Sequence, residues 1–112
     1  MDDPRFVQGV ALFNEREFLE ASECFEELFF EAVRDEVEFV RVFMQFSVGA
    51  YHAQMGQWRP AVERITEGVR VAALVSDHRG VDVMGLSAAM AAAARAIRKS
   101  EAPAWPQISR RR

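Results

Sequence analysis

Hydrophobic positions recur every three to four residues along most of the chain, whereas no useful stretch alternates with period two. This spacing gathers apolar side chains on one face of a helix and therefore predicts an all-α protein. The pattern breaks at polar and glycine-containing segments, which separate five helices. The predicted helices span residues 4–14, 17–33, 36–55, 58–75 and 83–99.

Residues with strong capping preferences mark the ends of these helices. Asp3, Asp35 and Asp82 stand immediately before predicted helices, where an aspartate side chain accepts hydrogen bonds from free backbone N–H groups. Gly56 follows the third helix, as expected for a glycine that adopts a left-handed conformation at a C-terminus. Residues 76–80 form the predicted loop before the fifth helix.

An offset of forty residues aligns the first predicted helical hairpin with the second. The order of small and aromatic positions in each resembles the tetratricopeptide helical hairpin, although a chance alignment of two amphipathic hairpins is an alternative explanation. We expect a compact five-helix bundle built from two tetratricopeptide-like helical hairpins plus a C-terminal helix. The aligned pairs are Gly9 with Gly49, Phe18 with Trp58, Ala21 with Ala61, Glu23 with Glu63 and Phe25 with Ile65.

The length of 112 residues suits one domain with one modest hydrophobic core. Residues 1–100 are expected to form a single helical-bundle domain. Pro103 and Pro106 interrupt regular structure, so residues 101–112 are expected to be a tail that is extended or disordered.

Charge is distributed unevenly along the chain. Residues 1–40 contain twelve acids and three arginines, for a charge of −9, whereas residues 41–112 contain five acids and eleven bases, for +6, which together give the net −3. The oppositely charged halves could fold onto each other or pair with a second copy, or one half could form a partner-binding face of one sign. A pI near 5.4 argues against a nucleic-acid binder.

A few features of the sequence indicate the cellular compartment of the protein and whether it contacts a membrane. Cys24 is the only cysteine, which excludes an internal disulfide and a zinc site built from several cysteines. The most hydrophobic stretch, residues 39–55, contains Arg41, Gln45 and His52 and is shorter than the roughly 20 residues of a membrane span. Since the first residues are acidic and resemble no signal peptide, we expect a cytoplasmic protein that does not contact a membrane.

A polar stripe follows the third helix, where Glu38, Arg41, Gln45 and His52 share one narrow face. If the second and third helices pack antiparallel, acids of the second helix can meet this stripe. Glutamate, glutamine and histidine together could hold a divalent metal or a small ligand, although His52 also fits an ordinary histidine at the edge of the core. The candidate polar site consists of Glu23, Glu26, Gln45 and His52.

Catalytic signatures are missing from the sequence. No HExxH spacing, nucleophile–base pair, glycine-rich phosphate loop or nucleic-acid-binding motif is present. The sequence therefore predicts no cofactor, leaves the metal undetermined and favours a protein that is not an enzyme.

Residues 18–29 resemble the first signature of domain of unknown function family 309, which consists of small all-helical proteins. The family pattern reads aromatic-aromatic-Glu-Ala-His-Glu-x-Leu-Glu, followed by a tryptophan. Ser22 stands in place of the histidine and Phe29 in place of the tryptophan. A second signature of the family is matched by Gln45, by the pair Tyr51-His52, and by Gly56 with Arg59 and Ala61.

The resemblance implies a helical-bundle fold and brings no established activity. Glu23, Glu26, Gln45 and His52 match family positions, but the loss of an imidazole at Ser22 weakens any metal or proton-transfer role for the cluster.

The sequence is compatible with two functions. The favoured one is a small, soluble, non-enzymatic module that self-associates as a homodimer or binds a protein partner. Six of the nine phenylalanines lie between Phe25 and Phe46, more than a small bundle is expected to bury alone. The alternative is a small hydrolase-like protein that binds a metal or ligand with the Glu/Gln/His cluster between the second and third helices.

Overall fold

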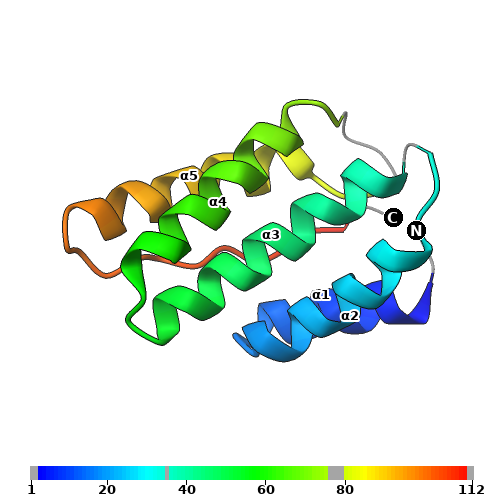
Figure 1. Ribbon diagram of the computed structural model, residues 1–112, viewed down its shortest axis with the longest axis horizontal. Helices are drawn as coiled ribbons and strands as arrows, with labels where there is room; N and C mark the ends of the chain where they lie inside the picture. The colour runs from blue at the N-terminus through cyan, green and yellow to red at the C-terminus, as the bar shows by residue number, and fades with distance from the viewer. Residues whose placement is uncertain (1–2, 35, 76–79, 111–112) are drawn as a thin grey trace.

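The computed structural model describes residues 3–34, 36–75 and 80–110, and these ranges form an all-α bundle (Figure 1). The five predicted helices are confirmed. Asp35, most of the predicted loop 76–80 and the last two residues of the predicted tail lie outside the described residues. The helices are α1 (Pro4–Asn14), α2 (Phe18–Glu31), α3 (Glu36–Gln54), α4 (Trp58–Ala72) and α5 (Val83–Arg98).

Each helix packs against the next one along the chain, so α1–α2 and α3–α4 are hairpins and α5 lies on α4. In Figure 1, α3 runs through the middle of the molecule, with α1 and α2 on one side and α4 and α5 on the other. None of the helices within the described ranges combines the length and the apolar character needed to cross a bilayer.

The helix ends follow the capping signals that the sequence provides. The Asp3 side chain accepts a hydrogen bond from the Arg5 backbone N–H, and Asp82 accepts one from the Gly85 N–H at 2.9 Å. The second helix ends two residues earlier than predicted, because Ala32 is extended and Arg34 adopts a left-handed φ of 57°.

Helices α1, α3 and α5 end in the same type of turn. Arg16, Gly56 and Ser100 each adopt a left-handed φ, of 69°, 73° and 59° respectively. Two backbone hydrogen bonds close the turn at each of these residues. At the end of α3, the Gln57 N–H donates to His52 O at 2.9 Å and the Gly56 N–H donates to Ala53 O at 3.0 Å. This pairing is the Schellman motif. Since Arg16 and Gly56 are forty residues apart, the offset found in the sequence is a structural repeat of the hairpin turn.

The glycine pair of the repeat has one structural role in both hairpins. A Cβ added at Gly9 would lie 2.7 Å from the Phe25 ring, and one added at Gly49 would lie 2.7 Å from the Ile65 side chain. Phe25 and Ile65 are themselves forty residues apart. Both hairpins therefore use a glycine on the first helix to admit a bulky residue from the second.

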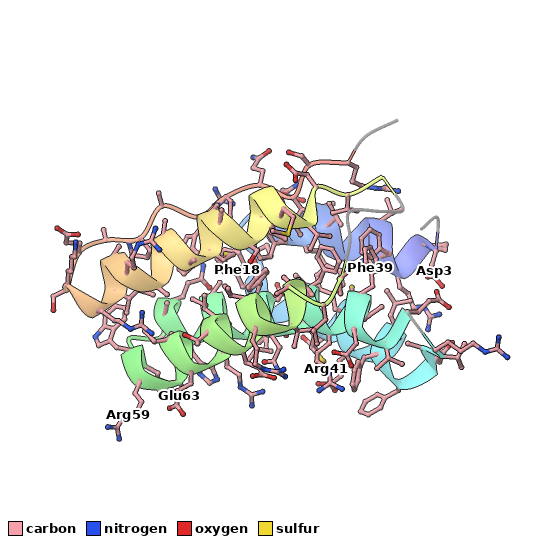
Figure 2. The ribbon with its side chains drawn as sticks, turned by 90° about the horizontal axis from the view of Figure 1, so that it is seen from above. Asp3, Phe18, Phe39, Arg41, Arg59 and Glu63 are labelled. Carbon is pink, nitrogen blue, oxygen red and sulfur yellow. The ribbon has the colours of Figure 1, made fainter. Side chains whose placement is uncertain are left out.

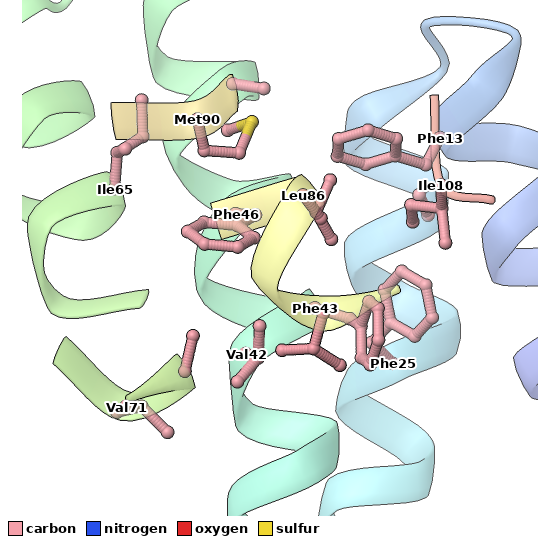
Figure 3. Close-up of a cluster of buried hydrophobic side chains, with 14 of the residues drawn as sticks. Phe13, Phe25, Val42, Phe43, Phe46, Ile65, Val71, Leu86, Met90 and Ile108 are labelled. Carbon is pink, nitrogen blue, oxygen red and sulfur yellow. The ribbon is translucent and has the colours of Figure 1, made fainter. Parts of the chain in front are cut away.

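The core is rich in phenylalanine (Figure 3). We expected the six phenylalanines from Phe25 to Phe46 to be more than the bundle can bury. This expectation is wrong for four of them, because their side chains are completely buried. The Phe6 ring, contributed by α1, packs against three other rings and completes their enclosure. Phe29 is half-buried, and Phe30 is 78% exposed.

The described part of the C-terminal segment, residues 101–110, is extended and runs back along the bundle behind α3 (Figure 1). Ile108 is buried, and its backbone N–H and C=O both bond the Asn14 side chain, at 2.7 and 3.2 Å. The Arg16 guanidinium donates to the carbonyl oxygens of Trp105 and Pro106. This segment is therefore attached to the first hairpin by contacts that span about ninety residues of sequence.

Candidate functional site

The structure separates the four residues of the predicted polar site. Glu23 and Glu26 are exposed on α2, Gln45 is buried on α3, and His52 is half-buried near the end of α3. Within the described ranges, no hydrogen bond joins any two of them. The expected convergence of the second and third helices on one polar pocket is not found, because Gln45 points to α4 rather than α2.

The polar stripe of α3 instead forms one side of a polar seam with α4. The Arg64 Nη1 donates to Gln45 Oε1 at 3.2 Å, and the Arg70 Nε donates to Glu67 Oε2 at 3.0 Å. Arg70, with a smaller contribution from Arg41, holds the pKa of the Glu67 carboxyl below its usual value. Of the stripe, Gln45 therefore bonds α4 directly, and Arg41 acts on Glu67 of α4 through its charge.

His52 belongs to the turn between α3 and α4. Its Nδ1 lies 2.6 Å from the Gln57 Oε1, and since an amide oxygen can only accept, the imidazole donates this bond. The bond ties the last turn of α3 to the residue that precedes α4.

Replacing His52 by alanine is expected to lower the free energy of unfolding by about 1 kcal/mol or less, the usual contribution of one hydrogen bond. Chemical denaturation followed by circular dichroism measures this change. Met55→Ala, which removes an exposed side chain from the same turn without removing a side-chain hydrogen bond, is a suitable comparison. A loss above about 3 kcal/mol would show that His52 has partners beyond Gln57.

No group of three or more His, Cys, Asp or Glu side chains in residues 3–34, 36–75 and 80–110 is arranged to hold a metal ion. The Ser22 hydroxyl, at the position of the family histidine, donates to the Leu19 carbonyl of its own helix. Burial, with the nearby Glu27 and Glu23, raises the pKa of the Cys24 thiol, which disfavours the nucleophilic thiolate. These side chains give no support to hydrolytic chemistry.

A groove of about 790 Å³ opens where the start of α4 faces the end of α5. This volume falls within the range of roughly 300–1,000 Å³ that is usual for binding sites. Its lining is mainly apolar, with charged groups around it. The residues that line it are Trp58, Arg59, Val62, Glu63, Ile97, Arg98, Ser100, Glu101, Ala102 and Pro103.

The charges around the groove are balanced and unpaired. Arg59 and Glu63 lie on the α4 side, and Arg98 and Glu101 lie on the α5 side. Among the residues that the structure describes, none of the four forms an ion pair, and Arg98 makes only a 3.4 Å contact with the Thr66 hydroxyl. Figure 2 shows Arg59 and Glu63 pointing outward from α4. A partner that approaches this surface therefore meets two positive and two negative groups that form no ion pair among the described residues.

Comparison with protein families identifies the chain. A model of the family described as Domain of unknown function (DUF309) matches residues 6–63, which is more than half of the sequence. The chain belongs to the DUF309 family. Neither the curated proteins nor the solved structures that were searched contain a match to it.

Only one wall of the groove lies within the residues that the DUF309 model matches. It includes Trp58, Arg59 and Glu63 on α4, whereas the whole of α5 lies beyond residue 63. Sequence reasoning missed this groove because the residues of its two walls are about forty positions apart and no motif connects them. The available signal was Trp58, the aromatic residue that aligns with Phe18 in the repeat.

The internal repeat of this DUF309 chain makes the exposure of Trp58 informative. Phe18, its counterpart in the first hairpin, is 1% exposed and packs against Phe13 and Trp105, whereas Trp58 is 55% exposed. The C-terminal segment that covers Phe18 does not enclose Trp58. An aromatic side chain that is buried in one hairpin is therefore open at the groove in the other.

Proposed function

We propose that this DUF309 chain is a non-enzymatic module that forms a homodimer through the groove between α4 and α5. The observation that supports this proposal is the open Trp58 beside an apolar groove whose surrounding charges form no ion pair within the described residues.

Charge balance favours a second copy of the chain as the occupant. In a dimer with two-fold symmetry the same surface serves both partners, so the surface must be complementary to itself. Two arginines and two glutamates around one groove meet this requirement, since each positive group of one copy can face a negative group of the other. A surface of one sign would repel its own copy.

Trp58 is the expected anchor of the dimer. An aromatic side chain buries about 150–250 Å² when it is enclosed, and tryptophan is enriched among residues that dominate interfaces. Reciprocal insertion of Trp58 into the partner's groove would cover the two exposed indoles together and enclose the surrounding apolar side chains.

Replacing Trp58 by alanine is expected to raise the dimer dissociation constant by about 30-fold or more, as for a central interface residue. Sedimentation velocity across a concentration series measures this constant for the full chain. Phe30→Ala is the matched control, since Phe30 is an even more exposed aromatic residue that lies away from the groove. A wild-type chain that remains monomeric at tens of micromolar would contradict the proposal.

Charge reversal gives a second, independent test of the same interface. Arg59→Glu makes the groove surface negative and Glu63→Arg makes it positive, so each variant alone is expected to dimerise poorly. An equimolar mixture of the two variants is expected to recover dimers, which native mass spectrometry can identify as mixed species. Failure of the mixture to recover dimers, while wild type forms them, would place the interface elsewhere.

A further inference from the structure

A second surface, which we name the outer face, lies on α2 and α3, away from the groove. Its α2 residues are spaced by four, three and four positions, and its α3 residues by seven, four and three, so each set occupies one side of its helix. The outer face consists of Leu19, Glu23, Glu26 and Phe30 on α2 and Val37, Met44, Val48 and Tyr51 on α3.

The apolar part of the outer face is accessible. Leu19 is 42% exposed and Phe30 is 78% exposed, whereas the four α3 residues of this face are half-buried. At one end of α3 the Arg41 guanidinium lies 5.1 Å from the centre of the Phe29 ring on α2. At the other end the Gln54 side chain donates to the Arg16 carbonyl, just before α2. These contacts hold the two helices side by side along this face.

The charged side chains that α2 contributes to the outer face are all acidic, whereas α3 contributes one basic group, Arg41, beside the Phe29 ring. Helix α2 contains five glutamates and no basic residue. Arg5 satisfies Glu31 and lowers the pKa of its carboxyl. Within the described ranges, Glu23, Glu26 and Glu27 are exposed and form neither an ion pair nor a side-chain hydrogen bond. The apolar stripe is therefore flanked by three uncompensated negative charges.

We propose that the outer face docks an amphipathic helix of a partner protein that places lysine or arginine beside its apolar side. The distance along α2 from Leu19 to Phe30 corresponds to eleven residues, or about 16 Å, which matches three turns of a docked helix. A helix that binds in this way contributes apolar anchors at i, i+4, i+7 and i+11, and the first and last of these match the separation of Leu19 and Phe30. Its basic flank would pair with Glu23 and Glu26.

Charge distinguishes this surface from the groove. The groove is balanced and suits a second copy, whereas two copies of the outer face would bring glutamates together. A basic partner helix satisfies both the apolar residues and the carboxylates of the outer face, so it is the occupant that the charges favour.

A synthetic 18-residue peptide with leucine on one side and lysine on the other is the probe for this surface. Fluorescence anisotropy of the labelled peptide is measured against the full chain at physiological salt. The same design with glutamate in place of lysine is expected to bind at least about tenfold more weakly. Equal binding of the two peptides would overturn the proposal.

The variants separate a specific contact from a general effect of net charge. Glu23→Gln with Glu26→Gln is expected to weaken lysine-peptide binding by about fivefold. The matched control is Gln8→Lys with Ala11→Lys, which changes the net charge by the same amount on exposed positions of α1 and is expected to leave binding within about twofold. An equal loss in both pairs would mean non-specific attraction and would refute docking at the outer face.

Single aromatic substitutions distinguish this inference from the proposed dimer. Phe30→Ala is expected to weaken the peptide by about tenfold without changing the oligomeric state, whereas Trp58→Ala is expected to have the opposite pattern. If Phe30→Ala dissociates a dimer, the outer face is a self-association surface and the partner-helix inference is wrong. If only the dimer prediction fails at Trp58, the outer face is unaffected.

Discussion

Replacing Phe43 by alanine is expected to lower the free energy of unfolding by about 3–5 kcal/mol, as is usual for deletion of a buried aromatic ring. The Phe43 side chain is completely buried, and its ring centre lies 5.2 Å from Phe6, 5.5 Å from Phe25 and 5.0 Å from Phe39. These partners come from three helices, and close packing leaves little freedom to fill the resulting cavity. Since small domains are stable by only about 5–15 kcal/mol, this loss is a large fraction of the total.

Urea denaturation followed by circular dichroism measures this change, with Phe30→Ala as the control for the loss of an exposed phenylalanine. The control is expected to stay within about 0.5 kcal/mol of the wild type. A loss below about 1 kcal/mol at Phe43 would mean that the ring is not enclosed as the structure describes.

Replacing Ile108 by alanine is expected to cost about 2–4 kcal/mol, the range for a buried aliphatic side chain. Ile108 is 4% exposed, and Figure 3 shows it beside Phe13. Both polar groups of its backbone bond Asn14, so the side chain is held against α1. The large effect is unusual for a residue that lies beyond the last helix.

Gln107→Ala provides the matched control, because Gln107 is an exposed neighbour in the same extended segment. Its substitution is expected to change stability by less than about 0.5 kcal/mol. If Ile108→Ala also leaves stability unchanged, the C-terminal segment is a separate tail, as the domain boundary proposed at residue 100 implies.

The helices of this protein were readable from the sequence because their signals are local. The apolar spacing of each segment, the caps at Asp3 and Asp82 and the left-handed glycine at Gly56 each depend on neighbours within about four residues. The forty-residue offset was visible because the glycine and the bulky residue that fit each other recur at equivalent positions in both hairpins.

The candidate site was less accessible to sequence reasoning. Helical spacing predicts that Gln45 and His52 share one face of α3, but spacing along one helix does not determine which neighbour that face meets. Gln45 bonds Arg64 on α4, and Glu23 and Glu26 face outward. The groove joins residues of α4 with residues about forty positions later, and no periodicity relates them.

The sequence by itself determined the five helices, the DUF309 family and the glutamate-rich surface of α2, because short-range spacing, capping and composition specify them. Only the tertiary structure decided that α3 pairs its polar stripe with α4, that Ile108 is part of the core and that Trp58 stays open while Phe18 is covered. These outcomes depend on which helix faces meet and on the path of the extended segment. Many distant apolar contacts set both jointly, and no single stretch of sequence encodes them.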